Sequence, residues 1–424
     1  MAQTASPLDI TAATDVLKEV YTSDQIHSQL NEEQILLSEI EVTEDYKDEV
    51  GSKAIGFVKD GRNVGLSSRP MNGGVNLGAA GHQQYDRWEL DYTAHYGQIK
   101  VLGTTIAKMS TARQAAVRAI TSEADGAIED MKKYQIRMLY GAGDALIARC
   151  GTSTTTNTID LYDATTLDAQ ASNDVLVRGW LQVGQYIDIG TTASEDSVVG
   201  EVTITAVSPS ESNPQITISG STVTTSSSHY ISIADNRDGT TSYEMNGLGN
   251  LVAATGAFAG IDPATKTTWK ATEVDAAGAS LSRTYMQQAY REARRYGGKT
   301  NVIVTALEHQ EDYYNLLQSQ VRFAGDVNLA SSGVTAKDQA PVFNGVPVVA
   351  DPDCPRRVMY FLDTKEMFRV SAGDFEWQNT TTGGDILAWS QNEDAFVGRL
   401  AGYMNLGTNK RRAHAKIKNL NISA

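Results

Sequence analysis

Residues 112–148 read ARQAAVRAITSEADGAIEDMKKYQIRMLYGAGDALIA, and this stretch decides the fold. Its apolar residues recur at steps of three, four and seven, as they do along one face of a helix. Thr111 followed by Gln114 is typical of a capping box, and Gly141 and Gly143 can end the helix. We predict one helix over residues 111–140, which at ~1.5 Å per residue is about 45 Å long and suits a structural spine. Its apolar face is formed by Val117, Ile120, Ala124, Ile128, Met131 and Met138.

A glycine-rich excursion precedes this helix over residues 51–105. Glycines separate short β-like pieces at 54–59, 87–94 and 98–106. Strands on either side of a glycine-rich tip predict a long β-hairpin. Isolated hairpins are only marginally stable in water, so we expect this one to need a partner surface.

The composition changes over residues 151–242, where Thr and Ser dominate and short alternating apolar segments follow one another between turns. This pattern predicts a small all-β domain inserted between the helix and the rest of the chain. Two interpretations of its role stay open: a dispensable domain on an outer surface, or a clamp between neighbouring subunits. Its expected core consists of Val183, Ile187, Val202, Ile204, Ile216 and Ile231.

From residue 268 onward the pattern is α/β. An amphipathic helix is expected over 281–296, ended by Gly297 and Gly298, and a second helix over 306–320. Strands are expected at 301–305, 342–349, 358–362 and 367–370. No internal repeat of 20–50 residues is present, which argues against a solenoid.

Size and composition bound the protein class. The chain has 424 residues, and one hydrophobic core rarely grows past roughly 250–300, so we expect two or three compact units. No run of about 18 apolar residues and no secretory signal pattern occurs, so synthesis in the cytoplasm is expected, without a membrane partner. Cys150 and Cys354 are best explained as buried thiols; a disulfide or a catalytic thiol is the alternative.

The net charge of −15 is unevenly distributed. Residues 1–50 carry twelve acidic and two basic residues, and residues 151–242 carry eleven and two, whereas 399–424 carry six basic residues and no acidic one. An acidic surface repels duplex DNA, which argues against sequence-specific DNA reading but suits a container around DNA. We expect residues 1–50 to form an arm that packs on another surface; a solvated, frayed terminus is the alternative.

No constellation of catalytic, cofactor-binding or metal-ligating residues emerges. The six histidines lack metal-ligand spacing, no Gly-x-Ser-x-Gly elbow occurs, and the glycines at 73–81 lack the Gly-Lys-Ser/Thr ending of a phosphate loop. Among acidic pairs, 351/353 is better explained by a turn than by Mg²⁺ or Ca²⁺, because Pro352 and Pro355 interleave it; 393/394 is the other candidate. We predict no catalytic residue, cofactor or metal, and no enzymatic activity.

The order of these parts resembles the major capsid proteins of tailed bacteriophages, the Hong Kong 97-type fold. GRNVGLSSRP at 61–70 and GHQQYDRWELDYTAHYGQIKVLGTTI at 81–106 are similar to the E-loop and its return strand. Residues 112–148 are similar to the spine helix and its exit. FNGVPVVADPDCPRRVMYFLDTKEMFRV at 343–370 is similar to the late axial-domain segment. The resemblance covers residues 1–150 and 243–424, with 151–242 as an insertion.

The resemblance implies an α+β fold with a set of named segments. They are an N-terminal arm (1–50), an E-loop hairpin (51–105), the spine helix of a peripheral domain (106–150), the inserted β-domain (151–242), a return to the peripheral domain (243–267), the axial domain (268–365), peripheral strands (366–405) and a C-terminal segment returning to the axial domain (406–424).

It also implies a structural function: self-assembly as pentamers and hexamers into an icosahedral or prolate head around packaged double-stranded DNA. The partners would be further copies of the chain, a portal, a separate scaffolding protein (or none) and a decoration protein, and the location the virion capsid. About 50 residues precede the E-loop, too few for the family's cleaved scaffolding segment, and the partners of its Lys–Asn cross-link cannot be matched. The alternatives are an encapsulin-type compartment shell and an unrecognised enzyme or carbohydrate-binding protein that uses the insertion.

Basic residues are the candidate intersubunit contacts on this acidic chain. Three lie in or beside the expected hairpin, and a second cluster lies near the C-terminus, followed by Lys416 and Lys418. For the second cluster we favour pairing with the acidic arm, of the same or a neighbouring subunit, over nucleic-acid binding. The candidates are Arg62, Arg69, Arg87, Lys410, Arg411 and Arg412.

Overall fold

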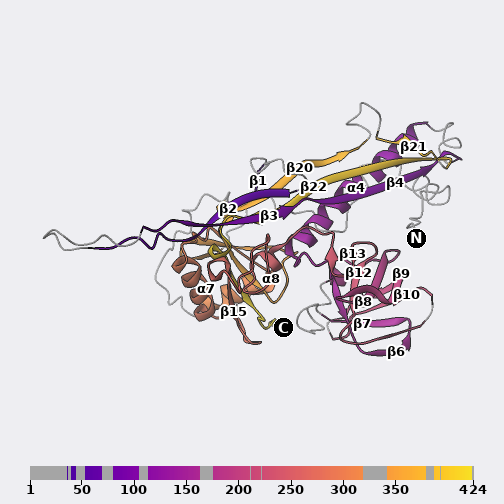
Figure 1. Cartoon of the computed structure of the whole chain (residues 1–424). Coiled ribbons are helices and arrows are strands. Elements are labelled where there is room, and N and C mark those ends of the chain that lie inside the picture. The colour runs from indigo at the N-terminus through magenta and orange to yellow at the C-terminus, as the bar shows by residue number, and fades with distance from the viewer. Residues whose placement is uncertain are drawn as a thin grey trace. The chain divides into compact units, whose positions relative to one another are not determined.

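The computed structural model describes residues 36, 40–43, 53–68, 80–104, 113–162, 175–210, 212–220, 222–318, 341–378, 386–391 and 393–422. Among these, one unit takes residues 93–245 and 371–404 with Leu36, and the second takes 40–92, 246–370 and 405–422. The chain contains both α-helices and β-sheets, which agrees with the predicted α+β class (Figure 1).

The first unit contains the predicted long helix, α4 (Arg113–Tyr140). Ala124, Met131 and Met138 of the expected face are buried, so the apolar period identified the inner side. Thr111 of the expected cap lies outside the described residues. Strand β4 (Thr93–Leu102) pairs antiparallel with β22 (Ala395–Thr408), and β21 (Ala388–Trp389) extends this sheet.

The inserted segment forms a closed barrel of six strands in the order β10-β7-β5-β12-β8-β9, also in the first unit (Figure 1). The barrel includes Ala148–Cys150, a few residues before the expected start of the insertion at 151, because β5 pairs with both β7 and β12. The strands are β5 (Ala148–Cys150), β7 (Thr158–Tyr162), β8 (Tyr186–Thr191), β9 (Ser194–Ser208), β10 (Gln215–Ile218) and β12 (Tyr230–Ile233). Two short pairs accompany them: β6 (Ser153–Thr156) with β11 (Val223–Thr225), and β13 (Arg237–Asp238) with β14 (Thr241–Ser242).

The barrel core is largely the predicted one. Ile187, Ile204, Ile216 and Ile231 are fully buried, and Val202 packs against them. Val183 is 60% exposed, so its assignment to the core was wrong. The reason is that residues 181–185 form turns between the barrel strands instead of the expected alternating strand.

The second unit has a six-stranded sheet in the order β15-β23-β19-β16-β18-β17, next to helices α7 and α8 (Figure 1). Ser282 caps α7, and its side chain accepts a hydrogen bond from the Tyr285 amide. All four residues of β16 are buried, as a central strand between parallel and antiparallel neighbours should be. The elements are β15 (Thr272–Asp275), α7 (Arg283–Arg295), β16 (Val302–Thr305), α8 (Leu307–Gln318), β17 (Val342–Phe343), β18 (Val346–Ala350), β19 (Met359–Leu362) and β23 (Ala415–Lys418), with the short α6 (Leu248–Leu251) before them.

The predicted hairpin is present in the second unit as β2 (Lys53–Gly61) and β3 (Gln84–Asp91), paired antiparallel from Lys53↔Asp91 onward. Strand β1 (Glu41–Thr43) pairs parallel with the first residues of β20 (Met367–Trp377). Strands β20 and β22 each contribute residues to both units.

Two glycines give a matched test of this architecture. Gly126 on α4 has open space where a side chain would begin, so Gly126→Ala should raise the unfolding free energy by about 0.5–1 kcal/mol through helix propensity. A methyl group at Gly56 would clash with the indole of Trp88, which is 1% exposed and cannot move aside, so Gly56→Ala should lower it by about 1–3 kcal/mol. Urea unfolding of both variants measures the two changes, and equal effects would contradict the described register.

Candidate intersubunit surfaces

The hairpin β2–β3 has one buried and one exposed face. Gly56 and Trp88 lie opposite each other on the buried face, and the Trp88 ring lies 5.4 Å from that of Phe368. On the other face Phe57 is 71% and Tyr85 63% exposed. We call Phe57, Tyr85 and their cross-strand partners Arg87 and Lys59 the hairpin face.

Polar contacts hold the strand pair of the hairpin to the rest of the second unit. The Lys266 ammonium lies 2.9 Å from an Asp60 carboxylate oxygen and 2.8 Å from one of Asp86. The Thr268 hydroxyl also donates to Asp60, and this bond, with that from Lys266, lowers the pKa of the Asp60 carboxyl. The Glu89 amide donates to the carbonyl of Ala259 at 2.9 Å. The exposed face is therefore carried by an anchored strand pair.

The three arginines predicted for the hairpin have different surroundings. Arg62 is exposed just beyond β2, and Arg69 lies outside the described residues. Arg87 is exposed on the hairpin face, where its guanidinium lies 2.8 Å from the Glu89 carboxylate. Arg62 and Arg87 thus remain accessible to another molecule.

Arg411, by contrast, is fully buried, so its prediction as an intersubunit contact was wrong. Its guanidinium donates to the carbonyls of Asn250 (2.8 Å), Leu251 (3.1 Å) and Gly256 (2.9 Å). Burial lowers its pKa to about 10. These bonds tie Arg411 to α6 and to the segment that follows it, within the second unit.

The other C-terminal cations are half-buried. Lys410 donates to the Gly297 carbonyl at 2.6 Å, and the Arg412 guanidinium lies 4.4 Å from the Tyr296 ring centroid. Lys416 and Lys418 both pair with Glu273, at 3.0 and 2.8 Å. Pairing of this cluster with the acidic arm stays a prediction, because most of residues 1–50 lie outside the described part of the chain.

A buried ion pair joins α4 to the segment that leaves the barrel. Arg137 and Glu244 have side chains only 7% and 4% exposed, and the guanidinium donates to the carboxylate. Burial opposes the charge of Arg137, but the Glu244 carboxylate outweighs this and raises the arginine pKa. Asn236 donates both to Glu244 (3.0 Å) and to the Tyr134 hydroxyl (2.6 Å). This buried network of hydrogen bonds and one ion pair fixes the barrel to α4.

His95 of β4 lies beside this cluster. It is 4% exposed, its Nε2 lies 3.0 Å from the Thr93 hydroxyl, and its ring packs edge-on against Tyr134. Burial lowers its pKa to about 4, because the positive form is poorly solvated there and Arg137 also opposes it, while Glu244 favours it. The neutral imidazole is therefore the folded form near neutral pH.

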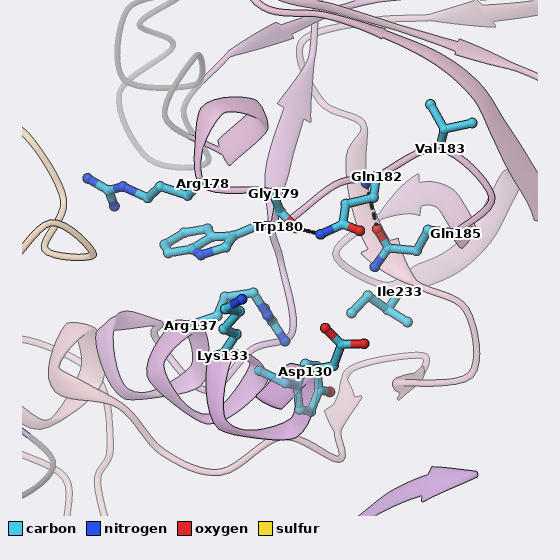
Figure 2. A pocket seen from close by; sticks show the side chains of 11 residues that line it. Asp130, Lys133, Arg137, Arg178, Gly179, Trp180, Gln182, Val183, Gln185 and Ile233 are labelled. Carbon is cyan, nitrogen blue, oxygen red and sulfur yellow. Dashed lines mark hydrogen bonds between the residues drawn. The ribbon is translucent and has the colours of Figure 1, made fainter. Parts of the chain in front are cut away.

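A cavity of about 320 Å³ lies between α4 and the barrel (Figure 2). Lys133 and Arg137 line it from the helix, and Arg178 and Trp180 from the loop before β8. The Arg178 guanidinium lies 5.4 Å from the centre of the Trp180 ring. Its remaining lining residues are Asp130, Tyr134, Gly179, Gln182, Val183, Gln185 and Ile233.

The features weighed for chemistry have structural roles in the described residues. The Asp353 amide donates to the Asp351 carboxylate at 2.9 Å, as in a turn, and Glu393 pairs with Lys100. Cys150 and Cys354 are buried thiols that form no disulfide, and burial raises the pKa of Cys150 to about 12. Within the described ranges no three His, Cys, Asp or Glu side chains gather as a metal site, and no helix is long and apolar enough to cross a membrane.

Sequence reasoning missed the hairpin face, the buried pair and the cavity. The alternation of Gly56 with Phe57 could have indicated two faces of the hairpin. Arg137 and Glu244 are 107 residues apart, and neither carries a local signal of its partner.

No protein-family model matches the chain, and no curated protein sequence matches it. Among solved structures, a chain of the cyanophage A-1(L) capsid asymmetric unit superposes with a TM-score of 0.53 at 13% identity, covering 94% of this chain and 98% of its own. A chain of a native GTA particle capsid gives 0.46 at 10% identity (97% and 98% covered). A chain of the holo-encapsulin complex from Synechococcus elongatus PCC 7942 gives 0.45 at 9% (95% of each).

The match to the cyanophage capsid chain shows the fold. It spans nearly the whole of both chains, so the predicted Hong Kong 97-type capsid fold is confirmed.

The buried ion pair should be costly to break from one side. Arg137→Ala leaves the Glu244 carboxylate buried without its cation and should lower the unfolding free energy of the first unit by about 3–5 kcal/mol. The double change Arg137→Met with Glu244→Leu should cost less than the single one, because no charge is then left buried. The control is Lys100→Ala, which removes the more exposed pair with Glu393 in the same unit and should change the unfolding free energy by less than ~1 kcal/mol. Urea unfolding measures the unfolding free energy of each variant. A double variant that is less stable than Arg137→Ala would contradict this account.

The surroundings of His95 predict loss of stability in mild acid. Its folded pKa of about 4 is below the ordinary 6.5, so the unfolded chain binds the proton first. The stabilisation that neutral, buried His95 gives the folded state is complete above pH 6.5 and is lost as the pH falls toward 4. The unfolding free energy should therefore fall by about 2 kcal/mol between pH 8 and 5.

His95→Gln should remove this part of the pH dependence while keeping a polar contact to Thr93. The decline due to fully buried His414, whose pKa burial lowers to about 3, should remain. His82→Gln, at an exposed position, serves as the control. The measurement is the urea midpoint from pH 8 to 4.5; identical curves for His95→Gln and the parent chain would show that His95 is not the group responsible.

Proposed function

We propose that this chain is the major capsid protein of a tailed bacteriophage, which assembles with copies of itself, as pentamers and hexamers, into the head around double-stranded DNA. The observation that carries the proposal is the fold shared with a cyanophage capsid chain over nearly the full length of both. In this function the chain is a structural component of the virion and not an enzyme.

The hairpin face supports self-association. It presents two large aromatic side chains to water on an anchored strand pair, and Val64 and Leu66 beyond β2 are 86% and 82% exposed. Apolar surface gains roughly 25 cal/mol per Å² when it is removed from water. Contact with a neighbouring subunit would remove these side chains from water and so yield that free energy. Arg62 and Arg87 would add electrostatic attraction to the acidic surface of the neighbour.

The segments take corresponding roles. The arm (1–50) and the hairpin β2–β3 with the loop between its strands would reach neighbouring subunits, whereas β4, within the expected hairpin range 51–105, pairs with β22 of its own subunit. Helix α4 would be the spine, and the six-stranded sheet with α7 and α8 would form the axial domain around the symmetry axes. Lys410 and Arg412 remain candidates for intersubunit contact at half-buried positions. A portal, a scaffolding protein and a decoration protein are the further partners we propose.

Assembly of the purified or co-produced chain tests the function. The parent chain, with a scaffolding protein if one is needed, should form rings or closed shells visible by negative-stain microscopy and light scattering. A chain that stays strictly monomeric with and without scaffold would refute the proposal.

The hairpin variant Phe57→Asp with Tyr85→Asp should give a folded subunit that assembles poorly, because both side chains are exposed in the subunit. Phe361→Asp, at a fully buried position, is the folding control and should yield no folded subunit. Normal shells from the hairpin variant would show that this face is not a contact.

A further inference from the structure

Cationic side chains concentrate at the cavity between α4 and the barrel (Figure 2). Arg137 is already paired with Glu244, yet its buried Nε has no hydrogen-bond partner in the described structure. Lys133 is half-buried, and no ion pair within the described ranges joins it to a carboxylate. Arg178, one of only two basic residues in 151–242, lines the same cavity. Asp130 also lines the cavity, so three cationic side chains and one carboxylate face it, and the site is a recess with a net positive charge on an acidic chain.

Hydrogen bonds bring acidic residues of β9 and of the segment around β13 together on the same barrel; the Gly239 amide, for example, donates to the Glu195 carboxylate at 2.7 Å. We call this group the acidic end: Glu195, Asp196, Glu201, Asp235 and Asp238. The buried Asp188 carboxylate holds two of these backbone segments next to each other, because it accepts hydrogen bonds from the amides of Glu201 (2.6 Å) and Asp235 (3.2 Å). The four members other than Glu195 are exposed. The second basic residue of the insertion, Arg237, is buried and donates to the carbonyls of Thr192 and Gly239. The exposed carboxylates therefore dominate the surface there.

We propose that the cationic cavity of one copy receives the acidic end of the barrel of a second copy. The contact rests on the proposed self-assembly and names its partner: the barrel is part of the lattice and not only a decoration. Opposite charges on one subunit allow either a reciprocal twofold contact or a head-to-tail contact, and both are repeated throughout a closed shell. The half-buried Trp180 ring lies beside Arg178 in the wall of the cavity and reduces the exposure of this cation to water.

Charge complementarity selects this occupant. Residues 151–242 carry eleven acidic and two basic residues, and the basic residue at the acidic end, Arg237, is buried, so this end of a second barrel brings exposed carboxylates to the contact. Each contact is small, and its contribution should weaken as salt screens exposed charges beyond ~8–10 Å. In a shell the same contact recurs once or more per subunit, so a modest attraction is sufficient.

Charge reversal with rescue tests the contact in the full-length chain. Lys133→Glu should give about tenfold fewer closed particles than the parent chain at low salt, and the difference should shrink at high salt, where the new repulsion is screened. Lys132→Glu is the matched control, because Lys132 is the adjacent, exposed residue of α4 and does not line the cavity. Thermal unfolding of the unassembled subunits should be alike for the two variants.

Rescue identifies the partner surface. Asp196→Lys, Glu201→Lys and Asp238→Lys are each introduced into the Lys133→Glu chain, and at least one should restore particle yield by re-forming an opposite-charge pair between copies. Yields of Lys133→Glu equal to those of Lys132→Glu would overturn the inference while leaving the proposed function intact. A defect that none of the three changes rescues would also overturn it, because the occupant would then not be the acidic end. Failure of the parent chain to assemble speaks instead against the proposed function.

Discussion

A two-stranded hairpin has two faces, and the second unit covers only one face of β2–β3. Trp88 closes that face against Phe368, which is possible because Gly56 leaves room for the indole. The same pairing turns Phe57 and Tyr85 outward. The proposed assembly depends on this constraint, since an anchored strand pair cannot bury both faces within its own subunit and must find the second contact elsewhere.

The barrel is attached by a different kind of interaction. A buried ion pair contributes little net stability, because desolvation of both charges offsets their attraction, but it strongly disfavours arrangements that separate the partners. Arg137 and Glu244, with Tyr134 and Asn236 around them, therefore define where the barrel sits on α4. The same positioning brings Arg178 of the barrel close to Lys133 of the helix, so the cationic cavity is a consequence of the attachment.

The basic residues near the C-terminus show how differently equal charges can be used. Lys410, Arg411 and Arg412 are adjacent in sequence and read as one cluster. In the fold Arg411 is turned inward to backbone carbonyls, whereas its neighbours stay half-buried against Gly297 and Tyr296. A guanidinium has five donors and can replace lost hydration by several carbonyls at once, which is why an arginine can occupy such an interior site.

The sequence by itself determined the helix α4, the hairpin, the inserted β-domain, the α/β segment and their order, because each depends on a local apolar period or a local turn signal. It also determined that the chain is acidic and that its histidines and cysteines lack the spacing of a metal site. Only the tertiary structure decided that Val183 faces solvent, that β5 belongs to the barrel, that Arg411 is internal, and that Lys133 and Arg178 share a cavity. These outcomes depend on contacts between residues far apart in the chain, such as Arg137 and Glu244, and a local pattern carries no information about which distant surface will cover it.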